Sequence, residues 1–396
     1  MLFSVLKENF YPFLLNEQMG PVIKKVFRIS FILFNAVLLL LYLLACLVPF
    51  LPAGKYWIIA ILGLVFPLLF FTLLLFFIYW LIKKSKWALL YAVVMLAGIQ
   101  QVTVFFSFRP VSKFNASVAP GNIRVMTWNL SSWGESNRKA KSNPNYQAEM
   151  VDIIKKSNAD VLCFQEYLYY KDSKYYDSVI PALKDYGYRY SFFAKSNYSK
   201  RIYKTTFLTQ SVILSKYPIK DSAYFFYNEH EFAEPLIYTD IMVNEKTIRV
   251  FSTHLESVKF ENYDYEALHK LKKPMDASIV QSRAVLYKLK QAYKKRAQQA
   301  EMLAGKIKQS PYPVIVCGDM NDVPNSYTYF TVKDDLQDAF LKKSGGLGRT
   351  FRYISPTLRI DYILADKKFE VENFSKIKVP YSDHYPILAD IAFKEK

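Results

Sequence analysis

Eight polar residues that can bind a metal or move a proton lie at or beside the ends of apolar segments between residues 123 and 391. They are Asn129, Glu166, His254, Asp319, Asn321, Asp361, Asp383 and His384. One such residue means little, because Asn, Asp and His often follow strands in turns. A series is more informative, since strands bring distant sequence positions together at one edge of a sheet. The pattern therefore predicts a single polar site.

The residue types in this set suit metal-assisted attack of water on a phosphoester. Glu166 and Asp383 are hard oxygen ligands, and with an amide oxygen from Asn129 they suit Mg²⁺ or Mn²⁺. Two His residues without a third do not make a zinc site. A metal held here would neutralise the phosphoryl oxygens. His384 could take a proton from water near neutral pH if Asp361 orients its ring.

The sequence offers little support for other hydrolytic chemistries. It has no Gly-rich phosphate loop and no G-x-S-x-G elbow. Its three cysteines, Cys46, Cys163 and Cys317, are an odd number without paired spacing, which argues against a disulfide framework. Cys163 and Cys317 stand in short apolar runs, where we expect buried thiols.

Several of these residues also have an ordinary structural interpretation. His254 lies in an alternating segment and could be a buried, hydrogen-bonded His. Asp361 could pair with Arg359 or Arg352, and Asn129 could cap a turn. The presence of all eight residues together favours the functional interpretation over these alternatives.

The elements that must position the site follow from the apolar pattern. We expect strands within 123–130, 159–166, 211–219, 248–257, 312–324, 357–366 and 379–391, and helices over 146–158 and 277–307. Strands that alternate with helices in this way indicate an α/β or layered β fold.

Three apolar runs precede this domain. Residues 27–51, 56–82 and 87–106 are each long enough to cross a hydrocarbon core of roughly 30 Å. The third is weaker, because Gln100 and Gln101 lie near its end, and it spans only if those amides reach the interface or a neighbouring helix. A cleaved signal peptide is disfavoured, since the first run is too long and two more follow. Residues 109–121 have the Pro, Ser and Gly content of a linker.

Basic residues near the runs predict an orientation. Three lie before or at the start of the first run, one lies between the first and the second, and three lie between the second and the third. In that order they are Lys24, Lys25 and Arg28; Lys55; and Lys83, Lys84 and Lys86. Positive charge marks the cytoplasmic side, so the N-terminus should be cytoplasmic and the chain after residue 107 should emerge outside. We therefore expect a multi-pass protein of the cytoplasmic membrane.

Charge also bears on the partner. From Arg109 onward, 44 basic residues stand against 32 acidic ones, a net charge of +12 out of +18 for the chain. Such an excess favours anionic partners, such as nucleic acid or phospholipid headgroups, although a solvated lysine-rich surface would look the same. No protein partner can be inferred.

Six motifs in this order make the chain similar to the endonuclease/exonuclease/phosphatase superfamily. They are WN at 128–129, QE at 165–166, STH at 252–254, GDMND at 318–322, RIDYI at 359–363 and SDHYP at 382–386. The resemblance covers about residues 122 to 394. It implies a four-layer sandwich of two packed mixed β-sheets flanked by helices, and Mg²⁺ held chiefly by Glu166 with Asn129 and Asp383 nearby.

The resemblance also implies roles for the remaining residues. His384 would be the general base, paired with Asp361, and His254 would contact the scissile phosphate or assist the leaving group. Asp319 would orient or activate water, and Asn321 would bind the phosphate.

The sequence thus predicts an all-α transmembrane region of three helices (1–108), a linker (109–121) and an α/β catalytic domain (122–396). The expected activity is that of a membrane-anchored, Mg²⁺-dependent, nuclease-like phosphodiesterase. Two alternatives stay open: a hydrolase of phospholipid or inositol-phosphate headgroups, and a catalytically silent membrane-tethered binding protein.

Overall fold

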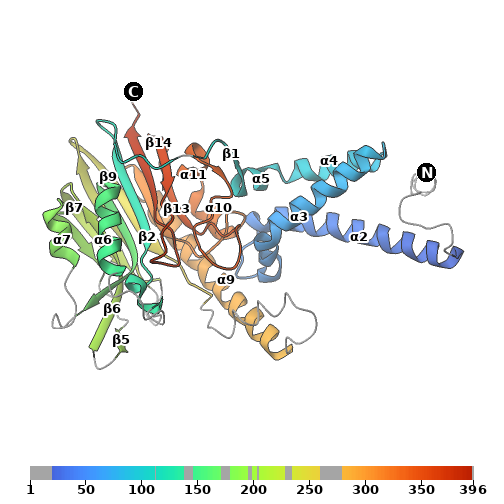
Figure 1. Ribbon diagram of the computed structural model, residues 1–396, viewed down its shortest axis with the longest axis horizontal. Helices are drawn as coiled ribbons and strands as arrows, with labels where there is room; N and C mark the ends of the chain where they lie inside the picture. Colours follow the sequence, from blue (N-terminus) through green and yellow to red (C-terminus); the bar gives the residue numbers. More distant parts are fainter. Residues whose placement is uncertain are drawn as a thin grey trace.

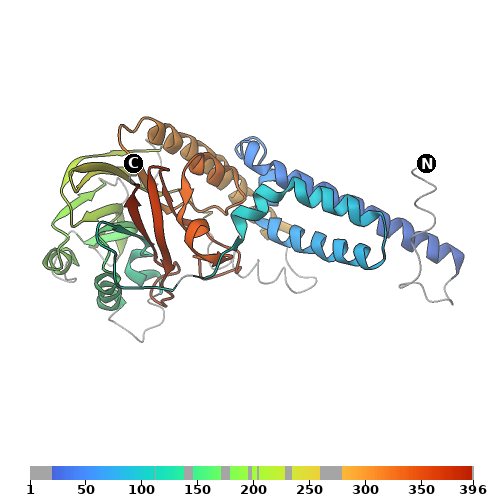
Figure 2. The same cartoon turned by 90° about the horizontal axis from the view of Figure 1, so that it is seen from above.

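The computed structural model of the protein describes residues 20–111, 113–137, 146–170, 179–194, 199–202, 205–227, 234–258 and 279–394. A bundle of apolar helices extends from one end of a β-sandwich domain (Figures 1 and 2). The bundle contains α2 (Pro21–Leu47), a short 3₁₀ turn η1 (Val48–Phe50), α3 (Trp57–Ile82), α4 (Trp87–Ala97) and α5 (Ile99–Phe105).

Two mixed sheets form the centre of the sandwich. The first has the order β11-β13-β10-β9-β8-β7. Its strands are β7 (Ile219–Phe225), β8 (Leu236–Val243), β9 (Lys246–His254), β10 (Val314–Asp319), β11 (Gln337–Asp338) and β13 (Asp361–Ala365). The second has the order β14-β15-β2-β3-β6-β4, with β5 also paired to β6. Its strands are β2 (Ile123–Asn129), β3 (Val161–Tyr170), β4 (Tyr190–Phe193), β5 (Ser199–Ile202), β6 (Thr205–Ser215), β14 (Phe369–Lys376) and β15 (Ile387–Phe393).

Helices cover the outer face of each sheet. The buried residues between the sheets are mainly β-branched or small side chains of both, such as Val125, Ile213, Val250 and Ile315. The helices α6 (Tyr146–Ser157) and α7 (Val179–Asp185) pack on the second sheet, and α9 (Ile279–Lys308) and α10 (Tyr327–Lys333) pack on the first. This arrangement confirms the expected four-layer sandwich.

Two predicted strand ends meet in register, together with Asp361, which was predicted within a strand. Asp319, the last residue of β10, is the Cα partner of His254 at the end of the parallel strand β9. On its other side Asp319 is the partner of Asp361, which begins the antiparallel strand β13. Asn129 ends β2, as expected. The ends of β9 and β10 and the start of β13 therefore lie at one edge of the first sheet.

The strand that carries Glu166 differs from the prediction. We expected it to end at Glu166, but β3 continues to Tyr170. Its pairing with β6 is interrupted between Phe164 and Tyr167, and Glu166 has φ +50°. A bulge of this kind lifts one side chain out of the normal alternation. Glu166 is thereby directed into the cavity described below rather than into a face of the sheet.

The third apolar run differs in detail from the single helix predicted over 87–106. It forms two helices, α4 and α5, bent by 62° at Gly98. A Cβ at Gly98 would collide with the Tyr42 hydroxyl, so glycine permits the close approach to α2. Gln101 Nε2 donates to the Cys46 carbonyl of α2 at 2.7 Å, so this amide reaches a neighbouring helix, as a span requires. Among the described residues, two helices are long and apolar enough to cross a membrane, or three if the bent pair counts as one span.

The helical bundle is joined to the sandwich by contacts and not only by the chain. Ser107 and Phe108 pair with Gly345 and Gly346 of the sandwich, forming the small sheet β1 (Ser107–Phe108) and β12 (Gly345–Gly346). Val104 of α5 belongs to the core beneath α9 and α10. The boundary expected at residue 108 is therefore crossed by buried contacts.

Candidate active site

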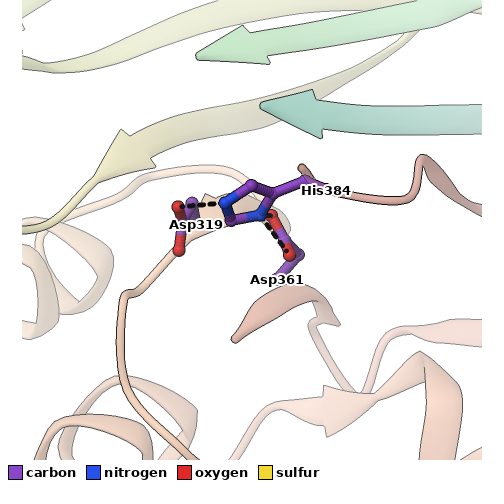
Figure 3. Close-up of side chains that lie close together, drawn as sticks. All are labelled: Asp319, Asp361 and His384. Carbon is purple, nitrogen blue, oxygen red and sulfur yellow. Dashed lines mark hydrogen bonds and ion pairs between the residues drawn. The ribbon is translucent and has the colours of Figure 1, made fainter. Parts of the chain in front are cut away.

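His384 lies between two aspartates (Figure 3). Its Nδ1 is 2.9 Å from Asp361 Oδ2, and its Nε2 is 3.6 Å from Asp319 Oδ2. Both carboxylates are almost fully buried. The His384 carbonyl accepts from Trp128 Nε1 at 3.0 Å, and its N–H donates to Ser382 Oγ. The imidazole is thus held from behind while its Nε2 side borders the cavity.

The expected alternative partners of Asp361 are engaged elsewhere. Arg359 pairs with Asp338 at 2.6 Å, and Arg352 donates to the carbonyls of Pro380 and Ser382. Within the described part of the chain, neither guanidinium contacts Asp361. Its principal partner is His384.

His254 occupies the opposite side of Asp319. Its Nε2 is 3.7 Å from Asp319 Oδ2 and 3.8 Å from Glu166 Oε1. Its Nδ1 is 3.5 Å from Glu234 Oε2. Since Asp319 approaches both imidazoles, the two histidines flank one shared carboxylate.

Glu234 is the residue that the sequence did not reveal. It is buried just before β8, where it accepts from the Glu166 backbone N–H at 2.9 Å and from Ser211 Oγ at 2.8 Å. It therefore fixes both the bulge of Glu166 and the ring of His254. The only signal in the sequence is an acid directly before Pro235 and an apolar strand.

Asn129 connects two carboxylates of the site. Its Nδ2 donates to Glu166 Oε1 at 3.1 Å and to Asp319 Oδ2 at 3.2 Å. Its Oδ1 accepts from the Ser131 backbone N–H at 3.0 Å. The amide thus presents nitrogen to the carboxylates, and it would have to turn over and release Ser131 to offer its oxygen to a metal.

Asn321 and Asp383 complete the predicted set. Asn321 has φ +50°, and its backbone N–H donates to Asp319 Oδ1 at 2.8 Å while its side chain donates to the Leu255 carbonyl. Asp383 accepts from Ser382 Oγ at 3.3 Å. Both residues line the same cavity as Glu166. The structure therefore brings together all eight residues singled out in the sequence.

Burial and charge perturb the titration of this group. Burial lowers the pKa of His254, but the hydrogen bond and charge of Glu234, with Asp319, outweigh it and raise the pKa to about 10. Burial also lowers the pKa of His384, yet Asp361 and then Asp319 raise it well above its usual value. Desolvation raises the pKa of Asp319 and of Glu166. Perturbed groups that converge in one place are typical of catalytic sites.

The site opens into a cavity of about 360 Å³. Its lining contains seven of the eight residues, with Asp361 behind His384. The apolar residues of the lining, which we call the apolar wall, include Leu64 of α3 and Leu289 of α9. Figure 1 shows α3 and α9 meeting where the bundle joins the sandwich.

The donor set fits a hard divalent cation. Glu166, Asp319 and Asp383 supply carboxylate oxygens to the cavity, and oxygen ligands are those that Mg²⁺ and Mn²⁺ prefer. Asp319, Asp361 and His384 also offer ligand atoms within 4.8 Å of one another. However, Nδ1 of His384 already contacts Asp361. The carboxylates on the Glu166 side are therefore the better candidates.

All three cysteines are buried and free, and burial was expected for Cys163 and Cys317. None of them lines the cavity, so thiol chemistry has no place in the site.

Comparisons with known proteins agree with this geometry. The family model described as "Endonuclease/Exonuclease/phosphatase family" matches residues 126–384. A second model, a domain of unknown function, matches residues 24–105. No curated protein matches the chain in sequence.

Three solved structures illustrate the similarity in fold. An endonuclease/exonuclease/phosphatase from Beutenbergia cavernae is 18% identical, with 69% of this chain and 72% of that chain covered and a TM-score of 0.48. The human Nocturnin catalytic domain with bound sulfate is 17% identical (69% and 94% covered, TM-score 0.46). A mannosyl-6-phosphatase from Bacteroides thetaiotaomicron is 15% identical (68% and 100% covered, TM-score 0.45).

Proposed function

The chain belongs to the endonuclease/exonuclease/phosphatase family, and we propose that it is a membrane-anchored, divalent-metal-dependent hydrolase of phosphoester bonds. The observation that carries this proposal is the position of His384, whose Nδ1 contacts Asp361 while its Nε2 borders a cavity lined by Glu166 and Asp319. A base that is oriented from behind and faces a group of oxygen ligands is suited to activating water.

The residues divide the reaction between them. His384 Nε2 takes a proton from water, the water oxygen forms the new bond to phosphorus, and the bond from phosphorus to the leaving alcohol breaks. Asp319 holds the attacking water, because it lies between both imidazoles. The raised pKa of His254 favours its protonated form, which would give a proton to the leaving oxygen so that an alcohol departs, or would donate a hydrogen bond to a phosphoryl oxygen while solvent protonates the leaving oxygen. We assign Asn321, which lines the cavity, to binding the phosphate.

We place the metal on Glu166 and Asp383, with Asn129 as a ligand only if its amide turns over. The ion would neutralise the negative charge of the phosphoryl group. Mg²⁺ is the expected ion and Mn²⁺ would substitute, since both favour carboxylate ligands.

We also propose that the apolar helices hold the enzyme in a membrane with the sandwich on the outer side. Support comes from large apolar side chains that face outward along α2 and α3, such as Leu33, Leu40, Leu68 and Leu75. An apolar surface of this extent is typical of contact with lipid.

The test is an assay of the full chain, purified in detergent, against plasmid DNA, RNA, sphingomyelin, inositol phosphates and simple phosphodiesters. The full chain is required because Val104 and Ser107 pack into the sandwich. We expect hydrolysis that needs Mg²⁺ and is lost in His384→Ala. Activity that survives both EDTA and His384→Ala would overturn the mechanism. Metal binding without turnover of any substrate would favour the silent binding protein instead.

A further inference from the structure

The apolar wall of the cavity is built by elements that do not belong to the sandwich alone. On α9, Val285, Leu289 and Tyr293 line the cavity and recur every four residues, so they share one face of the helix. From the helical bundle, Leu64 of α3 reaches the same cavity. The site is therefore shared between the catalytic domain and a helix apolar enough to cross a membrane.

The length of α3 places this wall at the membrane surface. The helix has 26 residues and measures about 39 Å, whereas a hydrocarbon core of roughly 30 Å takes up about 20 residues. Counted back from Ile82, those residues end near Gly63 and Leu64. The first two turns are covered instead by α9, since Trp57 and Ala60 pack with Tyr293.

The surface beside the cavity has the character of a membrane interface. Leu286 and Tyr287, which follow the cavity-lining Val285 on α9, are 44% and 63% exposed, and Ile354, which lines the cavity, is 45% exposed. Lys290 lies over the ring of Trp57, with Nζ 5.5 Å from its centroid. Exposed apolar side chains beside lysines and aromatic rings are typical of segments that contact anionic lipid.

We infer that the substrate is a phosphoester carried by a membrane lipid, and that its hydrocarbon chain lies against Leu64, Val285 and Leu289 while its phosphate lies at Glu166 and His384. This inference rests on the proposed hydrolase function and narrows it. A nucleic acid would leave the apolar wall without a partner. A lipid substrate therefore explains the apolar lining of the cavity, which the basic charge of the domain does not explain.

The test compares two diesters that differ only in the alkyl group: hexadecyl and methyl p-nitrophenyl phosphate. Both release p-nitrophenolate, and both are presented to the full chain in nanodiscs with Mg²⁺. Each buried methylene is worth about a fourfold gain in affinity, so we expect kcat/KM to be at least about tenfold higher for the hexadecyl ester.

Variants distinguish binding at the apolar wall from simple partitioning of the ester into the bilayer. Leu64→Trp fills the wall and should lower kcat/KM about tenfold more for the hexadecyl ester than for the methyl ester. Leu75 faces outward on the same helix and is 67% exposed, so Leu75→Trp should change kcat/KM for neither ester. Leu289→Trp repeats the test from α9. Independently of activity, a hexadecyl phosphonate with a diazirine in its chain should label peptides of α3 and α9.

Equal kcat/KM for the two esters, or equal losses in Leu64→Trp, would overturn the lipid inference. Hydrolysis of DNA or RNA without a preference for the hexadecyl ester would also overturn it, while the proposed hydrolase would stand. If no phosphoester is hydrolysed with any divalent metal, the proposed function fails and this inference fails with it.

Discussion

Nδ1 of His384 lies 2.9 Å from Oδ2 of Asp361, on the side of the imidazole that faces away from the cavity. This contact keeps the proton on Nδ1 and leaves Nε2 free to accept another. Asp361 itself is held by the Thr350 hydroxyl, which accepts from its backbone N–H at 3.1 Å. The orientation of the base is thus set by residues that never touch the substrate.

A pH profile tests this relationship. His384 must be neutral to accept a proton, and Asp361 raises its pKa, so activity should rise with pH along an acid limb above pH 6.5. Asp361→Asn removes the charge, so the limb should move to lower pH while the plateau of kcat falls by about 10²- to 10⁴-fold. An acid limb at the same pH in Asp361→Asn would show that Asp361 does not control the base.

Glu234 gives a second prediction, on stability. The folded-state pKa of His254 is raised to about 10, so its charged interactions stabilise the fold fully below pH 6.5 and are lost as the pH rises through 10. In EDTA at pH 7, Glu234→Gln should lower the free energy of unfolding by about 1–3 kcal/mol. Denaturant titrations should show this difference shrinking toward pH 10, and a difference independent of pH would contradict the assignment.

Glycine-to-alanine substitutions test how the helical bundle packs on the sandwich. A Cβ at Gly63 of α3 would collide with the Asn325 carbonyl, whereas nothing lies within 4 Å of the corresponding position at Gly305 of α9. Gly63→Ala should therefore lower the melting temperature of the full chain. Gly305→Ala should raise stability by about 0.5–1 kcal/mol, because alanine is the better helix former. Equal effects of the two substitutions would show that the bundle does not pack as described.

Orientation in the membrane can be tested by cysteine labelling. The three native cysteines are buried, so a cysteine introduced at an exposed site should be the main target of an impermeant maleimide in intact cells. We expect labelling at Lys394→Cys in the sandwich and none at Lys84→Cys between α3 and α4 until the cells are permeabilised. The reverse pattern would place the catalytic domain in the cytoplasm.

The sequence predicted the parts of the site that depend on strand ends. Asn129, His254 and Asp319 follow or close apolar runs. Because side chains alternate between the two faces of a regular strand, the position of its last residue determines where that side chain lies. The bulge at Glu166 was not predicted, because it depends on pairing with β6 and on a hydrogen bond from the Glu166 backbone N–H to Glu234 that forms only in the folded chain.

The helical region shows the same limit. Length and hydropathy were sufficient to locate its apolar runs, but the bend at Gly98 arises from the approach of α2. The contact of Leu64 with the cavity is likewise a property of tertiary packing, since its sequence neighbours are those of an ordinary membrane helix. Local patterns therefore identified the two regions but not the cavity that they share.

The central claim is that a metal held by Glu166 and a base at His384 act together on a phosphoester. The most direct measurement is the initial rate of hydrolysis by the full chain, in Mg²⁺ and in EDTA, for the native protein and for Glu166→Gln. We predict that EDTA and Glu166→Gln each lower the rate by about 10²-fold or more, and that EDTA adds little to the effect of the substitution. A Glu166→Gln variant that keeps the native rate and its full dependence on Mg²⁺ would contradict the account.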